Sequence, residues 1–181
     1  MTEVAASVSL EPVSLRHADS MFAWVSDSAI RDSIGLSNEP SPERTREWIR
    51  SASTDPTTEA FAILSAGRHV GIVTLDHIED RTQSARLSIY IGESDARGKG
   101  IGLTALRLAL RHGFENLGLH RIWLTVHAEN LPAIRTYRAA GLILEGSLRD
   151  SFRIGDRLID SHVFAILRTE FENTPSSESP Q

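Results

Sequence analysis

Three glycines and two cations are interleaved in one short segment of the chain, Arg97-Gly98-Lys99-Gly100-Ile101-Gly102. The segment follows a predicted strand and opens a predicted helix. Glycines let a backbone approach a bulky anion closely, and a helix start offers unpaired N–H donors with a partial positive charge. With the full charges of Arg97 and Lys99, this pattern predicts a cradle for phosphate groups. The glycines considered alone are equally explained by a turn that binds no ligand.

The spacing of these glycines excludes two common nucleotide-binding motifs. Between Gly92 and the pair Gly98-Lys99 there is one residue too many for a P-loop, and Gly100 stands where that motif needs a metal-binding Ser or Thr. The glycines also do not fit the G-x-G-x-x-G fingerprint of dinucleotide-binding folds. We therefore set aside a nucleotide-hydrolysing protein and a Rossmann domain.

A second pair of polar residues, Asn130 and Tyr137, stands seven positions apart on a predicted helix. Asn130 is suited to cap the start of that helix, because its side-chain oxygen can accept a backbone N–H. Tyr137 shares a helix face with Ile134 and Gly141, and from the residues alone it is explained as a core aromatic. The chain has no cysteine, which excludes disulfides, thiolate metal sites and cysteine nucleophiles. We predict no metal site.

The remaining sequence predicts the strands and helices that must position these residues. In chain order they are a strand at 8–15, helices at 19–25 and from Ser41 onward, strands at 60–64, 70–75 and 85–91, a helix at 101–117, a strand at 121–126, a helix at 130–140, and strands at 143–152 and 157–167. Trp48 and Ile49 are expected on the buried face of the helix that begins at Ser41. The order predicts an α/β fold with helices around a mixed sheet. We expect a single domain over residues 1–172 and a disordered Ser/Pro/Glu-rich tail at 173–181.

Composition and charge restrict the class of protein. The chain has 181 residues, 40% of them hydrophobic, and no run of about 18 apolar residues that could span a membrane. Its first residues do not resemble a signal peptide, and the absence of cysteine fits a cytoplasmic protein. The net charge of −5 argues against nucleic-acid binding. Residues 95–138 nevertheless carry seven cations and three anions, which fits either a compact anionic ligand or chance clustering on solvated helix faces.

Taken together, these motifs resemble those of the GNAT superfamily of N-acetyltransferases. Arg97-x-x-Gly100-x-Gly102 matches its R/Q-x-x-G-x-G/A motif, and Asn130-x-x-Ala133-Ile134-x-x-Tyr137-x-x-x-Gly141-Leu142 is similar to its second half. Ile89-Tyr90-Ile91-Gly92-Glu93 resembles its cofactor-contacting strand. Leu144-Glu145-Gly146-Ser147-Leu148-Arg149 resembles the branch that includes ribosomal-protein-alanine N-acetyltransferases. The resemblance covers roughly residues 8–171, and it implies a mostly antiparallel central sheet that splays around the cofactor, with flanking helices.

The resemblance implies how the cosubstrate acetyl-CoA would be held. Backbone groups of Ile89-Tyr90-Ile91 would pair with its pantetheine arm. Backbone N–H groups of the segment Arg97-Gly98-Lys99-Gly100-Ile101-Gly102 would hold its pyrophosphate. Asn130 would hydrogen-bond the same arm, and Tyr137 would point its hydroxyl at the thioester sulfur.

The same resemblance implies acetyl transfer from acetyl-CoA to a primary amine of a small molecule or a protein N-terminus. The amine would attack the thioester directly, and a backbone N–H near Ile91 would stabilise the oxyanion. Tyr137 would protonate the departing thiolate. Two alternatives stay open: a non-catalytic acyl-CoA-binding regulatory module, and an enzyme that uses a longer acyl-CoA such as succinyl-CoA.

The general base and the acceptor site are left open by the sequence. Candidates for the base are a water chain, His77, Glu79, His127 and Glu145. By analogy with the family, the residues that could shape the acceptor pocket are Trp24, Phe22, Arg31, Tyr90 and Arg149, each of which a structural role explains as well. The partner implied is an amine acceptor, with neither nucleic acid nor membrane involved. A homodimer formed through the last strands is an expectation from the family alone.

Overall fold

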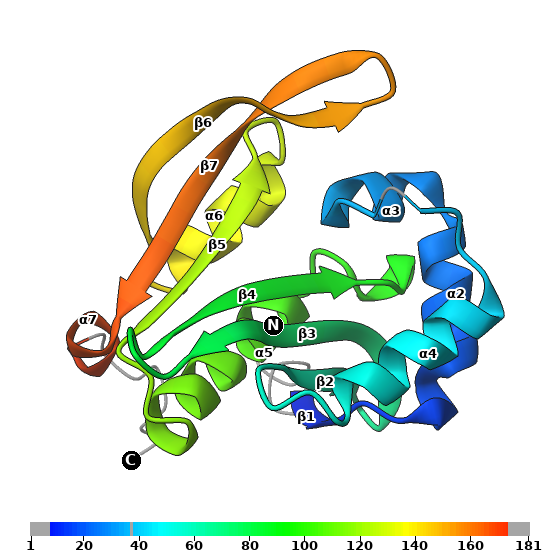
Figure 1. Ribbon diagram of the computed structural model, residues 1–181, viewed down its shortest axis with the longest axis horizontal. Helices are drawn as coiled ribbons and strands as arrows, with labels where there is room; N and C mark the ends of the chain where they lie inside the picture. The colour runs from blue at the N-terminus through cyan, green and yellow to red at the C-terminus, as the bar shows by residue number, and fades with distance from the viewer. Residues whose placement is uncertain (1–7, 37, 174–181) are drawn as a thin grey trace.

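The computed structural model describes residues 8–36 and 38–173, and its centre is a mixed sheet of seven strands (Figure 1). In their order across the sheet the strands are β1 (Val8–Pro12), β2 (Glu59–Ser65), β3 (Arg68–Glu79), β4 (Ser84–Ile91), β5 (Arg121–His127), β7 (Arg157–Leu167) and β6 (Ile143–Ile154). Neighbouring strands run antiparallel except β4 and β5, which run parallel. The predicted fold class is confirmed. The tail predicted to be disordered lies, apart from Asn173, outside the described residues.

Helices cover both faces of this sheet. They are α2 (Ala18–Ser26), α3 (Ser28–Ile34), α4 (Pro42–Ala52), α5 (Ile101–Arg111), α6 (Leu131–Ala139) and α7 (Arg168–Glu172), with short 3-10 turns at Leu15–His17 and Ser94–Ala96. Successive residues of a strand point to opposite faces, and β2 divides accordingly. Ala60 and Ala62 belong to the core formed with α2 and α4, whereas Phe61 and Ile63 belong to the larger core formed with α5.

Two predicted helix starts are confirmed by their capping bonds. The Ser41 hydroxyl accepts a hydrogen bond from the backbone N–H of Arg44 at 3.2 Å, with Pro42 in the first turn of α4. The side-chain oxygen of Asn130 accepts one from the N–H of Ala133 at 3.2 Å at the start of α6. Each cap satisfies a backbone donor that the helix itself leaves unpaired.

The helices differ from the prediction at several points. Trp48 was predicted to be buried and is 40% exposed, whereas Ile49 is 1% exposed. Neighbouring residues of a helix point about 100° apart, so the narrow buried stripe of α4 accommodates only one of them. The predicted helix at 101–117 is α5 followed by a π-helical turn at His112–Asn116. The helices α3 and α7 were not predicted.

The strands β4 and β5 diverge, and this divergence is what positions the site. They pair only from Ser84↔Arg121 to Arg86↔Trp123. Beyond those three pairs β4 continues beside β3, while β5 continues beside β7, and a gap opens between them (Figure 1). The splayed sheet implied by the family resemblance is therefore present.

The hairpin of β6 and β7 projects from the rest of the fold (Figure 1). β6 is the last strand of the sheet and is exposed along most of its length. Its pairing with β7 is interrupted by irregularities between Leu144 and Gly146 and between Leu148 and Phe152. Within the described ranges, no helix has the length and apolar character needed to cross a membrane.

Candidate active site

The edge of β4 that faces the gap pairs with no strand beyond Arg86 in the described part of the chain. On its other edge, the N–H of Gly92 donates to the carbonyl of Val70 in β3 at 2.9 Å. Backbone groups of successive residues in an antiparallel pair alternate between facing the partner strand and facing away. Tyr90 therefore directs its backbone groups to β3, whereas Ile89 and Ile91 direct theirs into the gap. Of the three residues expected to pair with a pantetheine arm, Ile89 and Ile91 have the orientation to do so.

The glycine segment forms a tight loop that leads directly into α5. Gly98 and Gly100 have φ angles of 72° and 81°, in the left-handed region that favours glycine. A Cβ atom at either position would meet nothing within 4 Å, so the backbone conformation, not crowding, requires glycine there. Gly100 is the N-cap of α5, and its carbonyl accepts the first helical bond from Thr104 at 3.1 Å. The amides of Ile101 and Gly102 lie in the first turn, where a helix offers donors to an anion.

Arg97 fixes this loop to the end of β4. Its Nε donates to the carbonyl of Ile91 at 3.0 Å, and its Nη2 donates to the carbonyl of Gly92 at 2.9 Å. Arg68 in β3 holds the start of the loop by pairing with Asp95 at 2.7 Å. The guanidinium of Arg97 thus points toward the carbonyls at the end of β4. Its contribution is to hold the loop in place.

Trp24 in α2 packs against the residue that joins β4 to this loop. A Cβ atom on Gly92 would lie 2.0 Å from Cδ2 of the indole, so only glycine allows the approach. The indole Nε1 donates to Oε1 of Glu93 at 2.9 Å. Trp24 is 6% exposed, and this buried contact ties α2 to the strand end.

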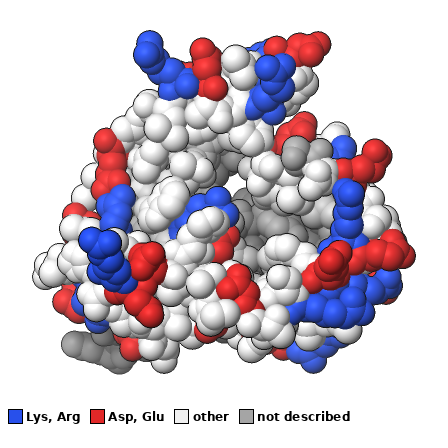
Figure 2. All heavy atoms as spheres, viewed as in Figure 1, with Lys and Arg blue, Asp and Glu red and all other residues white. Residues whose placement is uncertain are grey.

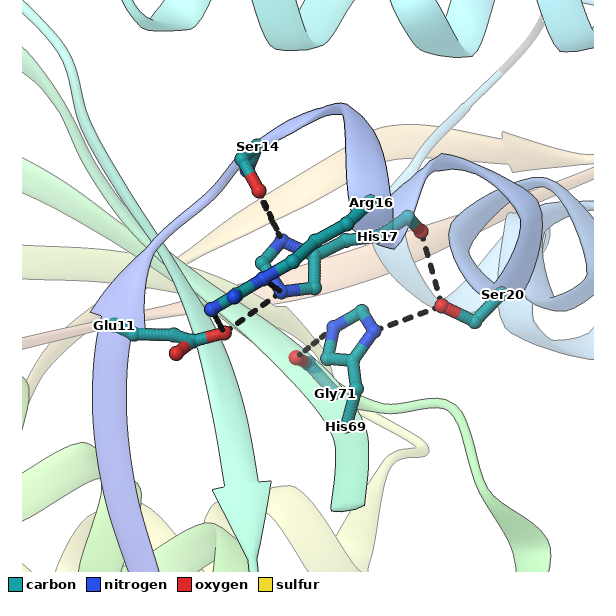
Figure 3. A network of polar contacts seen from close by, with 7 residues as sticks. All are labelled: Glu11, Ser14, Arg16, His17, Ser20, His69 and Gly71. Carbon is teal, nitrogen blue, oxygen red and sulfur yellow. Dashed lines mark hydrogen bonds and ion pairs between the residues drawn. The ribbon is translucent and has the colours of Figure 1, made fainter. Parts of the chain in front are cut away.

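A network of polar contacts holds the start of α2 against the sheet (Figure 3). The Nδ1 atom of His17 lies 3.0 Å from the backbone N–H of Ser14 and accepts its hydrogen bond. The Nε2 atom of His17 lies 2.8 Å from Oε1 of Glu11 and 3.2 Å from Nε of Arg16. Arg16 also pairs with Glu11, and this contact, followed by that of His17, holds the pKa of the carboxyl below its usual range.

His69 in β3 lies beside His17 in the same network (Figure 3). Its Nδ1 lies 2.8 Å from the hydroxyl of Ser20, and its Nε2 lies 3.0 Å from the carbonyl of Gly71. The ring centroid is 4.6 Å from that of His17 and 4.6 Å from that of Trp24. Burial, with a smaller contribution from His17, lowers the pKa of His69 to about 4. The ring is therefore neutral near pH 7 and supports the position of the indole.

Tyr137 reaches the gap from α6. It is 7% exposed, and its ring centroid lies 6.2 Å from that of Phe164 in β7. Burial raises the pKa of its hydroxyl to about 12, so the group keeps its proton at neutral pH and can act as a donor. Asn130 caps the start of the same helix, seven positions before Tyr137.

A cavity of about 290 Å³ opens beside Tyr137, between β4, β5 and the end of α3. Its lining residues are Ser33, Ile34, Gly35, Arg86, Leu87, Ser88, Ile89, Thr125, His127, Tyr137, Phe152 and Ser161. Figure 2 shows the molecular surface hollowed between the β6–β7 side and the side that carries α3. The lining combines hydroxyl groups with a guanidinium, an imidazole and apolar walls, and it contains no carboxylate among the described residues.

The family model described as "Acetyltransferase (GNAT) domain" matches residues 7–143. The chain belongs to the GNAT family. It is 32% identical over 120 residues to the spermidine N(1)-acetyltransferase of Vibrio cholerae, covering 66% of this chain and 69% of that relative. A crystal structure of a Vibrio cholerae spermidine N-acetyltransferase with CoA and spermine aligns with a TM-score of 0.88 at 25% identity, covering 93% and 99% of the two chains. A dodecameric structure of that enzyme aligns with a TM-score of 0.81 at 26% identity, covering 94% and 99%.

This GNAT protein is an acetyl-CoA-dependent N-acetyltransferase, as are the relatives it matches in sequence and structure. Its own geometry fits the cosubstrate. The loop from Arg97 to Gly102 presents backbone amides at a helix start, which suits a pyrophosphate. The free edge at Ile89 and Ile91 suits the amide groups of a pantetheine arm.

The GNAT fold brings most of the predicted site residues around one gap. Ile89 and Ile91 line one side, the glycine loop follows from the same strand, and Tyr137 approaches from α6. Of the four side chains considered as a base, only His127 lines the cavity. Glu145 is bound to Arg121 by two short contacts of 2.5 Å.

Several cavity residues were missed by sequence reasoning. The residues suggested for the acceptor pocket, Trp24, Phe22, Arg31, Tyr90 and Arg149, are not among those that line the cavity. Ser33, Ile34 and Gly35 line it instead, because α3 lies over the gap. Its sequence signals were present: the Asp27 carboxylate caps the N–H of Ala29 at 2.9 Å, and Gly35 ends the helix with φ of 75°.

Proposed function

We propose that this enzyme transfers the acetyl group of acetyl-CoA to a primary amine of a small molecule or a protein N-terminus, by direct attack of the amine on the thioester. One observation carries the proposal: the gap between β4 and β5 has a glycine loop and a helix start at the end of one wall, and Tyr137 beside a cavity at the other. The cosubstrate would lie along the free edge of β4, and the amine would enter through the cavity.

Each group around the gap has a separate role in binding or catalysis. The amides that begin α5 hold the pyrophosphate, and the backbone groups of Ile89 hold the pantetheine arm. The N–H of Ile91 stabilises the oxyanion, an effect of about 3–4 kcal/mol for a well-placed donor. Tyr137 protonates the leaving thiolate, a contribution of about 10²–10⁴-fold in rate. Asn130 keeps its side-chain NH2 available for the cosubstrate while its oxygen caps α6.

Isothermal titration calorimetry with CoA and acetyl-CoA tests the first half of this proposal. We expect micromolar binding that a Gly100→Trp variant loses, because a large side chain in the left-handed loop position displaces the phosphate donors. Acetyl-CoA consumption with a panel of primary amines tests the second half. Competition between acetyl-CoA and succinyl-CoA reports the acyl preference. Absence of CoA binding by the folded wild-type protein would contradict the assignment of the loop.

We further propose that the β6–β7 hairpin joins two copies of the chain. β6 is an edge strand, and Ile143, Leu144, Leu148 and Leu158 on the hairpin are each 41–53% exposed. An uncovered edge with apolar side chains favours pairing with another chain. The dodecameric spermidine N-acetyltransferase of Vibrio cholerae shows that a similar chain assembles. Light scattering should give a mass above the monomer that Leu148→Glu reduces, and a monomeric wild-type protein would contradict the proposal.

A further inference from the structure

His127 is the last residue of β5, and it lines the same cavity as Tyr137. The imidazole packs on Phe152 of β6 with ring centroids 4.1 Å apart and an interplanar angle of 34°. No described residue forms a hydrogen bond or ion pair with either ring nitrogen. A half-buried imidazole that is held by stacking, lies beside the cavity and has no hydrogen-bond partner among the described residues is suited to accept a proton from a ligand.

Burial favours the neutral form of the His127 imidazole over the charged form. Burial lowers the pKa of the ring, opposed in part by Asp32 of α3 and by Glu129 after β5. Glu129 is itself engaged by Arg157 at 2.8 Å. Across the cavity, Arg86 of β4 is held by Asp76, with Nε 2.8 Å from Oδ1 and Nη2 2.9 Å from Oδ2. The cavity therefore presents an uncharged imidazole with a free lone pair.

The other groups in the cavity are unsuited to take a proton near pH 7. Arg86 is already cationic, and Tyr137 keeps its proton. The remaining polar side chains are the hydroxyls of serine and threonine, and no carboxylate lines the cavity in the described part of the chain. His77, another histidine considered from the sequence, has a 69% exposed side chain bound to Asp76 on the surface.

We propose that His127 is the general base that takes the first proton from the acceptor's ammonium group; this inference rests on the acetyl transfer proposed above. The ammonium N–H bond breaks, and its proton moves to the ring of His127. The neutral amine then forms the N–C bond at the thioester carbonyl, and the C–S bond breaks. Tyr137 gives its proton to the departing thiolate, and the second proton that the nitrogen loses as the amide forms returns to the Tyr137 oxygen. His127 releases its proton to water. The balance is one amide, one thiol and one released proton.

The pH dependence of kcat/KM tests this role with acetyl-CoA and the best acceptor among spermidine, glucosamine and glycinamide. His127→Ala should lower kcat/KM by about 10²-fold at pH 7, and the loss should shrink as pH rises, because free amine then forms without a base. Added imidazole should restore part of the activity of His127→Ala. His127→Phe keeps an aromatic ring against Phe152 but accepts no proton, so it should be as impaired as His127→Ala. His77→Ala should match the wild type.

Two results would overturn the proposal while leaving the acetyl-transfer function intact. One is a His127→Phe enzyme with the wild-type pH profile, since the ring would then matter only for packing. The other is an NMR titration of the His127 imidazole in the CoA complex that finds it protonated above pH 7. A wild-type protein that acetylates none of the amines contradicts the proposed function itself, and the same NMR titration still decides whether His127 is a neutral acceptor.

Discussion

The guanidinium of Arg97 donates a hydrogen bond from Nε to the carbonyl of Ile91 at 3.0 Å. This bond joins the glycine loop at Arg97–Gly102 to the residue whose N–H faces the gap. We propose the Ile91 N–H as the oxyanion donor and the loop as the pyrophosphate site, so Arg97 would link the two ends of the proposed cosubstrate site. The position of the cosubstrate at both of its ends would then depend on Arg97, a side chain that we do not expect to touch the thioester.

Arg97→Ala should lower kcat/KM for acetyl-CoA by about 10–100-fold, because it removes two hydrogen bonds that hold the loop to β4. Steady-state kinetics with varied acetyl-CoA measures the effect, and both KM and kcat should change. Arg111→Ala provides the control, since Arg111 is an exposed cation at the far end of α5, away from the loop. Equal effects of the two variants would mean that Arg97 contributes only charge.

Gly100→Ala and Gly118→Ala should have similar effects on stability but different effects on CoA binding. Both glycines have positive φ, 81° and 69°, and neither Cβ would meet another atom within 4 Å. Alanine in this conformation costs about 1–2 kcal/mol at each position. Urea denaturation should show comparable losses, whereas calorimetry should show weaker CoA binding only for Gly100→Ala. Equal CoA affinities of the two variants would place the phosphate site elsewhere.

Tyr137→Phe should lower kcat by about 10²-fold or more while leaving CoA affinity nearly unchanged. The ring stays buried beside Phe164 and only the proton donor is lost. Since burial raises the pKa of the hydroxyl to about 12, the wild-type rate should show no loss from Tyr137 ionisation up to about pH 11. Steady-state turnover gives kcat, and calorimetry gives CoA affinity, for the wild type and Tyr137→Phe. Unchanged turnover would remove Tyr137 from the mechanism.

His69 should make the protein less stable as the pH falls from about 6.5 to about 4. The imidazole of an unfolded chain titrates near 6.5, and burial lowers the pKa of His69 to about 4 in the fold. Between these values the unfolded state binds more protons, so the free energy of unfolding decreases as pH falls. Because the residue is only partly buried, we expect the His69 contribution to be about 1–2 kcal/mol.

The difference between wild type and His69→Gln isolates that contribution. Urea denaturation at pH 4 to 7 should give a shallower dependence for His69→Gln, whereas the exposed His120→Gln should follow the wild type. The pKa of Glu11 is held low by Arg16, so protonation of Glu11 also lowers the free energy of unfolding, at more acidic pH. Parallel curves for wild type and His69→Gln would show that His69 titrates as it does in water.

Local features of the site were predicted from the sequence because neighbours along the chain determine them. The left-handed turns at Gly98 and Gly100 need glycine whatever surrounds them. The caps at Ser41 and Asn130 bind amides three residues away. Alternation of apolar residues similarly indicated most strands before their partners were known.

The tertiary structure decided which of these elements meet and which side chains are free to act. Only three residue pairs join β4 to β5, and no local signal marks where that pairing stops. The direction of the Arg97 side chain depends on where its loop lies beside the end of β4. The exposure of Trp48 depends on how α4 packs against the sheet. His127 and Phe152 lie 25 positions apart, yet their stacked rings form one wall of the cavity. Such contacts arise from packing between distant segments, whereas a single sequence specifies directly only the conformations that adjacent residues impose.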